Sequence, residues 1–252
     1  MSFKSEFSCV QVQEALQTLR TTEFRKEDGT PHELFFHDGL SISELSQLEQ
    51  RLGTALPADY RSLLLECSGI DGLPIELDFA PESPFDWASD VFPFGVPFAA
   101  DGMGNFWIVD CVSPPEAEAV IFFDCHDPPI TLYQGRGMAG FLLDLIPLAQ
   151  QEDSKIDAVH EDEIFNVWGT HPNVLTRAEA YASGDRELKL FAEDLPDDFE
   201  VIDLRDPPVG MGYAWGRYGP DPRLERHGMK RIFAVAPSTK KPGFFARLFQ
   251  RR

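Results

Sequence analysis

The side chains best suited to chemistry in this sequence are its histidines and cysteines, and their spacing limits what they could do. Cys125, His126 and Asp127 combine a thiol, an imidazole and a carboxylate, but chain neighbours are not arranged for the hydrogen-bond relay of a catalytic triad. The nucleophile-elbow sequence Gly-x-Ser-x-Gly does not occur. His160 begins the run His-Glu-Asp-Glu without the second histidine that a zinc-protease helix needs one turn later, so we expect a solvated helix start there.

The cysteines and glycine pairs also point away from a cofactor site. The four cysteines, at positions 9, 67, 111 and 125, are far apart, and Cys67 and Cys111 lie in apolar contexts typical of buried free thiols. The glycine pairs at 102–104 and 210–212 predict turns, because neither is followed by a strand-to-helix phosphate motif. We therefore expect no metal, no cofactor and no enzymatic activity. The Trp-Gly-Arg-Tyr-Gly sequence at 215–219, near several acids, is where an enzymatic site would otherwise be sought.

Carboxylates are the abundant functional groups of this chain. Its 252 residues include 42 acidic and 22 basic side chains, for a formal charge of −20. Such a charge argues against binding nucleic acid, because most of the surface would repel a phosphate backbone, and it favours a basic partner. The alternative is that the acidity only keeps the protein soluble.

Two acidic stretches are the candidate partner-binding sites. The first lies in residues 71–95, where proline, aspartate and aromatic side chains without periodicity predict an ordered surface loop. Exposed aromatic residues beside acids are common in protein-binding surfaces, although Phe85, Trp87 and Phe92 could equally pack onto the core. The second is the run at 193–206, which holds the densest group of acids in the chain. The candidate contact residues are Asp71, Asp78, Asp86, Trp87 and Asp90 in the first stretch, and Glu193, Asp194, Asp197 and Asp198 in the second.

The elements that would position these acids are clearest at residues 41–72. Ser41 followed by Glu44 forms a capping box, and apolar residues at three- and four-residue spacing predict a helix over 42–52 that ends at Gly53. Pro57 suits the start of a second helix over 57–67. Gly69 or Gly72 would end that helix.

A sheet and further helices are predicted on either side of this helix pair. The β-branched and aromatic runs between 96 and 134, divided by glycine or proline turns, predict an antiparallel meander, and 138–150 predicts a helix that covers it. Residues 7–20 predict a helix, and Asp28-Gly29 after it indicates a hairpin or a loop.

The C-terminal hundred residues predict a smaller α+β region. Residues 160–169 and 177–183 have helical patterns. The runs 212–219 and 230–237 predict strands that pair with 199–204, either as a second sheet or as an extension of the first. Residues 240–252 carry five basic and no acidic side chains, which predicts a frayed tail or a docking segment for a membrane surface or a partner.

The helix pair carries a resemblance to a known family. The sequence resembles the opening signature of the SMI1/KNR4 family, also called SUKH, and the likeness continues through 96–112, 119–124 and 141–146. It implies an α+β fold with a mostly antiparallel sheet flanked by helices over about residues 35–150. We expect a 1–34 N-terminal extension, a smaller α+β extension over 151–239 and the basic tail 240–252. The signature residues are Leu48, Glu49, Leu52, Gly53, Leu56, Pro57, Tyr60, Leu63, Leu64 and Gly69.

The resemblance also implies a function without catalysis. Bacterial members are implied to be immunity proteins that bind and block a toxin, and a strongly acidic chain suits a basic toxin such as a nuclease. A regulatory scaffold, as the fungal members imply, is the alternative. The chain shows neither a secretory signal nor a run of apolar residues long enough for a membrane span, so we expect a cytoplasmic protein. Its oligomeric state stays open.

Overall fold

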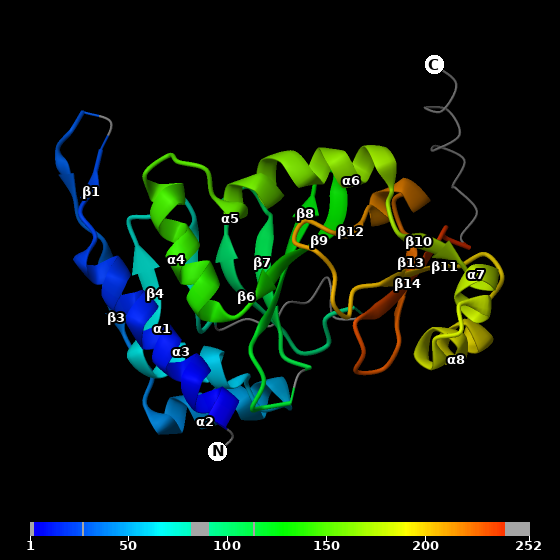
Figure 1. Ribbon diagram of the computed structural model, residues 1–252, viewed down its shortest axis with the longest axis horizontal. Coiled ribbons are helices and arrows are strands. Elements are labelled where there is room, and N and C mark those ends of the chain that lie inside the picture. The colour runs from blue at the N-terminus through cyan, green and yellow to red at the C-terminus, as the bar shows by residue number, and fades with distance from the viewer. Residues whose placement is uncertain (1–2, 27, 82–90, 113, 240–252) are drawn as a thin grey trace.

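The computed structural model describes residues 3–26, 28–81, 91–112 and 114–239. Two sheets dominate it, one of eight strands and one of four, with a separate two-stranded hairpin near the N-terminus. The predicted α+β class is therefore confirmed (Figure 1). Up to residue 149 the elements are α1 Phe3–Thr21, β1 Phe24–Arg25, β2 Pro31–His32, β3 Phe35–Asp38, α2 Ile42–Leu52, α3 Ala58–Glu66, β4 Cys67–Asp71, β5 Glu76–Asp78, β6 Gly95–Ala100, β7 Phe106–Asp110, β8 Val120–His126, β9 Pro129–Arg136 and α4 Met138–Ala149.

The remaining elements form the C-terminal region. They include a six-residue π-helix (η1) and a short 3-10 helix (η2). The list is α5 Lys155–Asp157, η1 Ala158–Glu163, α6 Ile164–Thr170, β10 Val174–Thr176, α7 Arg177–Ala182, α8 Arg186–Asp194, β11 Glu200–Asp203, β12 Gly212–Tyr213, η2 Trp215–Tyr218, β13 Arg223–Arg226 and β14 Ile232–Ala236.

The helix pair forms for the reasons that the sequence gives. Ser41 and Glu44 make both hydrogen bonds of the capping box at the start of α2. Gly53, with a φ of 71°, supplies the left-handed residue that ends this helix. The second helix is shorter than predicted, because Cys67 is already extended and begins β4, so Gly69 lies in a strand rather than at a helix end.

The large sheet is antiparallel throughout, in the order β12-β9-β8-β7-β6-β5-β4-β3. Its strands β6 to β9 are the predicted meander. One face, here called the inner face, packs against α1, α3, α4 and the α5–α6 segment through a core that includes Leu63, Trp107, Phe123 and Leu142. The loop prediction for 71–95 was wrong at Glu76–Asp78, which forms β5: residues 75–79 alternate between buried and exposed.

The small sheet, in the order β10-β11-β14-β13, packs on the other face of the large sheet, the outer face. Ile108, Phe122 and Tyr133 from β7, β8 and β9 meet Ile202 and Phe233 of the small sheet in a second core. The predicted pairing of 199–204 with 230–237 is confirmed as β11 with β14.

The predicted strand at 212–219 was wrong beyond its first two residues. Gly212 and Tyr213 pair with β9 and so extend the large sheet, whereas 215–218 forms the 3-10 helix η2. Gly212 is so close to β9 that a Cβ there would lie 2.0 Å from the carbonyl oxygen of Thr131. Only glycine permits this close approach of β12 to β9.

Candidate functional site

The half of the outer sheet face made by β3, β4 and β5 is acidic. Ile70 and Leu77 lie opposite each other on β4 and β5, and both are buried in the inner core. Side chains alternate between the two faces of a strand. Asp71, Glu76 and Asp78 therefore point to the outer face, where all three are exposed.

The edge strand β3 adds an aromatic side chain to this half. Phe35 pairs with Asp71 and is 65% exposed, a large fraction for a phenylalanine. Its ring meets the His37 ring edge-on at 5.3 Å, and His37 Nε2 lies 2.9 Å from Asp71 Oδ2. We call the five residues Phe35, His37, Asp71, Glu76 and Asp78 the open sheet face.

The carboxylates of the open sheet face are largely without cationic partners. Asp71 contacts His37, which is a cation only when it is protonated. In the described residues, no lysine or arginine lies within ion-pair distance of Glu76 or Asp78. Asp78 Oδ1 accepts a hydrogen bond of 3.0 Å from the backbone N–H of Ala80. The negative charge is thus available to a partner.

The second acidic stretch forms a separate surface, which we call the α8 patch: Glu193, Asp194, Asp197 and Asp198. All four are exposed, while Leu195 and Phe199 between them are buried. Arg177 pairs with Asp197 at 2.9 Å, and Arg223 pairs with Asp198, so half of this patch is already compensated. Figure 1 places α8 and β3 at opposite ends of the molecule, so the two predicted sites do not form one contact surface.

The other predicted contact residues of the first stretch, Asp86, Trp87 and Asp90, lie outside the described residues, as does Phe85. Phe92, which follows them, packs against Phe122 and Phe233 and is 2% exposed. For this residue the core alternative is therefore confirmed. Glu76 is a member of the site that the sequence prediction missed; the alternation of Ile75-Glu76-Leu77-Asp78-Phe79 was the signal that could have revealed it.

The glycine turn between β6 and β7 borders the open sheet face. Its tip, Met103, is 69% exposed, and Gly102 lies beside the carboxylate of Glu76. Asp101 holds the turn together by accepting hydrogen bonds from the backbone N–H groups of Met103 and Asn105 and from the Asn105 side chain. The turn is therefore a preformed, rigid border of the face.

His160 supports this turn from the C-terminal region. The expectation of a solvated helix start was wrong, because the His160 side chain is only 18% exposed. The His160 ring stacks on Trp107, with 5.8 Å between the ring centroids. Its Nε2 atom lies 3.0 Å from Asp101 Oδ2. Burial alone would raise the pKa of Asp101, but hydrogen bonds from His160, Met103 and Asn105 outweigh it and lower this pKa.

The 215–219 segment, where an enzymatic site would be sought, contains a Tyr–His–Glu contact. Tyr218 Oη donates to Glu200 and lies 2.7 Å from His171 Nε2. Burial raises the pKa of Tyr218 and lowers that of His171. The tyrosine therefore stays protonated, and this contact does not provide an activated nucleophile.

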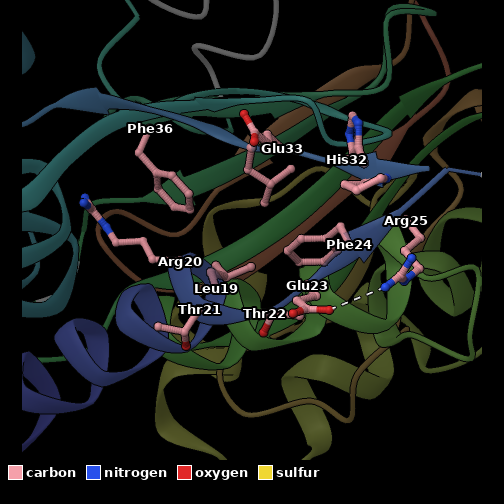
Figure 2. A pocket seen from close by; sticks show the side chains of 12 residues that line it. Leu19, Arg20, Thr21, Thr22, Glu23, Phe24, Arg25, His32, Glu33 and Phe36 are labelled. Atoms are coloured by element: carbon pink, nitrogen blue, oxygen red, sulfur yellow. Dashed lines mark ion pairs between the residues drawn. The ribbon is translucent and has the colours of Figure 1, made fainter. Parts of the chain in front are cut away.

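A pocket of 510 Å³ lies on the other side of β3, between the end of α1 and the β1–β2 hairpin (Figure 2). Leu19 and Phe24 give it an apolar floor. Arg20 lies over the Phe36 ring at 4.8 Å, while Arg25 pairs with Glu23 at 3.7 Å. The two arginines point to opposite sides of the pocket, so they do not converge on a ligand (Figure 2).

Comparison with known proteins agrees with the fold. The model of the SMI1 / KNR4 family (SUKH-1) matches residues 39–144. The chain therefore contains a domain of this family, and the regions before and after it lie outside the matched part. No curated protein matches the sequence. Within the described residues, no group of three or more histidine, cysteine or acidic side chains could hold a metal ion, and no helix is long and apolar enough to cross a membrane.

Proposed function

We propose, from the premise that residues 39–144 form an SMI1/KNR4 (SUKH-1) domain, that this protein is an immunity protein that neutralises a basic, nuclease-type toxin by binding it. The observation that supports the proposal is the open sheet face. It presents three carboxylates that are not compensated by lysine or arginine side chains of the described chain. Binding there needs no catalytic group of this protein.

Physical chemistry favours an acidic inhibitor for such a toxin. A nuclease binds phosphates with a basic surface, so an acidic protein is attracted to the same surface that the substrate uses. Opposite charge raises the rate of encounter, and close packing then excludes the substrate. The overall charge of −20 acts at long range, whereas the open sheet face would make the contacts.

The function is tested by co-expressing the full-length protein with each neighbouring toxin-like open reading frame. We expect one toxin to kill cells alone, to be harmless in the presence of this protein, and to co-purify with it. If no neighbouring toxin is neutralised and the purified protein instead captures host proteins, the immunity proposal is wrong.

The role of the open sheet face is tested with charge-neutralising substitutions. The triple variant Asp71→Asn, Glu76→Gln, Asp78→Asn should weaken toxin binding by about tenfold or more, because each lost contact with a charged group contributes about 1 kcal/mol or more. The matched control is Glu152→Gln, Asp153→Asn, Asp162→Asn, which removes the same charge from exposed positions elsewhere. Equal affinity of the two triple variants would contradict a specific role for this face.

A regulatory scaffold is the second candidate function. It is favoured by the C-terminal region, which lies outside the family match and yet forms a four-stranded sheet on which α7 and α8 pack. A scaffold would bind folded partners without inhibiting an enzyme. A toxin gene immediately upstream would favour immunity over this alternative.

A further inference from the structure

Among the described residues, a second layer covers one half of the outer face of the large sheet and none covers the other half. Over β7, β8 and β9 the small sheet covers this face. Asp110, at the end of β7, forms ion pairs with Arg226 and Arg231 of the covering layer. Over β3, β4 and β5, the five residues of the open sheet face are exposed. A sheet face that carries an exposed phenylalanine is normally covered by a second layer.

We infer that the uncovered half is a docking platform for a basic α-helix of the protein partner. This inference rests on the proposed function and specifies which part of the partner makes the contact. Phe35 serves as an apolar anchor, and Asp71, Glu76 and Asp78 receive lysine or arginine side chains from one face of the helix. Helices α1, α3 and α4 cover the inner face of the same sheet, and α3 contacts β4.

The dimensions of the platform fit a helix. Adjacent strands are about 4.8 Å apart, so the distance from β3 to the turn after β6 is about 15 Å. A helix with its side chains is about 10–12 Å in diameter and therefore covers this width. Met103, 69% exposed at the tip of the turn, lies at the far border of the platform from Phe35.

The spacing of the carboxylates fits the spacing of side chains on a helix. Asp71 and Glu76 lie on neighbouring strands, where side chains of the same face are about 5 Å apart. Side chains three or four residues apart on a helix are separated by about 5–6 Å. A helix with lysines at such positions can therefore contact the acids of β4 and β5 at the same time.

The test uses two synthetic peptides and the full-length protein. The first peptide is a helix of about 18 residues with lysines at i, i+4 and i+7 and leucines beside them, long enough to be helical alone. The second has the same composition in scrambled order. Binding is measured by fluorescence anisotropy, and the contact surface is mapped by chemical-shift changes in NMR spectra.

We expect the patterned peptide to bind at least about fivefold more tightly than the scrambled one, with shift changes in β3, β4, β5 and the 101–105 turn. Phe35→Thr should weaken binding of the patterned peptide about fivefold, since it removes the apolar anchor without changing the charge. Met103→Gln tests the same border if Phe35→Thr disturbs β3, and Glu152→Gln with Asp153→Asn, at exposed positions outside both acidic surfaces, should leave the affinity unchanged.

Equal binding of the two peptides, or shift changes centred on the α8 patch, would overturn the inference. These results are distinguishable from a failure of the proposed function. A protein that neutralises its toxin in cells but binds both peptides equally is an immunity protein that uses another surface. A protein that binds the patterned peptide here but neutralises no toxin has the platform without the proposed function.

Discussion

Two buried carboxylates of the large sheet, Asp110 and Asp124, are accommodated in different ways. Asp110 accepts hydrogen bonds from the guanidinium groups of Arg226 and Arg231, so its charge is compensated. Asp124 accepts a hydrogen bond from Thr131 and is wholly buried beside Tyr213. Burial raises its pKa to about 8, even though hydrogen bonds from Thr131 and Trp215 oppose the shift. At neutral pH, Asp124 is therefore mostly protonated.

Asp124 makes stability depend on pH. Below about pH 4 both the folded and the unfolded states hold its proton; between pH 4 and 8 only the folded state does. This group's contribution to the free energy of unfolding therefore falls as the pH rises through that window, by up to about 1.4 kcal/mol per pH unit. We expect the free energy of unfolding, measured with urea between pH 5 and 8, to depend less on pH in Asp124→Asn than in the wild type. Equal pH slopes would contradict the assignment, and Asp127→Asn, an exposed substitution on the same hairpin, is the control.

His160 is a positioning residue for the turn that borders the open sheet face. His160→Phe should keep the stacking on Trp107 but remove the hydrogen bond to Asp101, at a cost of about 1–3 kcal/mol because the acceptor is a buried carboxylate. We expect faster amide exchange of Met103 and Asn105, whose N–H groups bond to Asp101. Asp162→Asn, at an exposed position of the same π-helix, should not change this exchange; unaltered exchange in His160→Phe would show that the turn is rigid without the histidine.

At the scale of the elements, local signals were predictable from the sequence and long-range contacts were not. The capping box joins Ser41 and Glu44, which are only three residues apart, so the start of α2 could be predicted from the sequence. The alternation over 75–79 marks Asp78 as exposed, but its place on the same face as Asp71 depends on the pairing of β4 with β5, which no local pattern encodes. Likewise, residues 215–218 form a 3-10 helix and not the predicted strand. Gly216 in this helix packs against Pro129, a residue 87 positions earlier in the chain.

The buried carboxylate of Asp110 adds ion pairs to the apolar contact between the two sheets. Asp110→Asn leaves the guanidinium groups of Arg226 and Arg231 buried without a counter-charge, and breaking such a cluster costs about 3–5 kcal/mol. We expect a lower urea midpoint and faster proteolysis of the C-terminal region. Arg177→Gln breaks the exposed pair with Asp197 and should cost at most about 1 kcal/mol. Comparable losses in the two variants would mean that the Asp110 cluster does not hold the sheets together.

At the scale of the whole molecule, the C-terminal region completes the core of the large sheet. Ile108, Val120, Phe122 and Tyr133 on the outer face pack against the small sheet, and β12 extends the large one. A chain that ends at residue 150 would expose these side chains as one apolar patch, and such patches promote aggregation. We expect the 1–150 fragment to be insoluble or to bind a hydrophobic dye strongly. A soluble, monomeric fragment with a cooperative unfolding transition would show that the predicted 35–150 domain folds independently.

The charge of the whole molecule should act mainly on the rate at which a partner is captured. Attraction between a chain of charge −20 and a basic toxin extends over about 10 Å at 0.1 M salt but only about 3 Å at 1 M. We expect the association rate constant, measured by stopped flow, to fall about tenfold or more between low and high salt, while the dissociation rate changes much less. Neutralising Asp71, Glu76 and Asp78 removes only three of 42 acids, so the salt dependence of association should largely persist while dissociation accelerates. An association rate that is independent of salt would mean that the acidity of this chain serves solubility and not recognition.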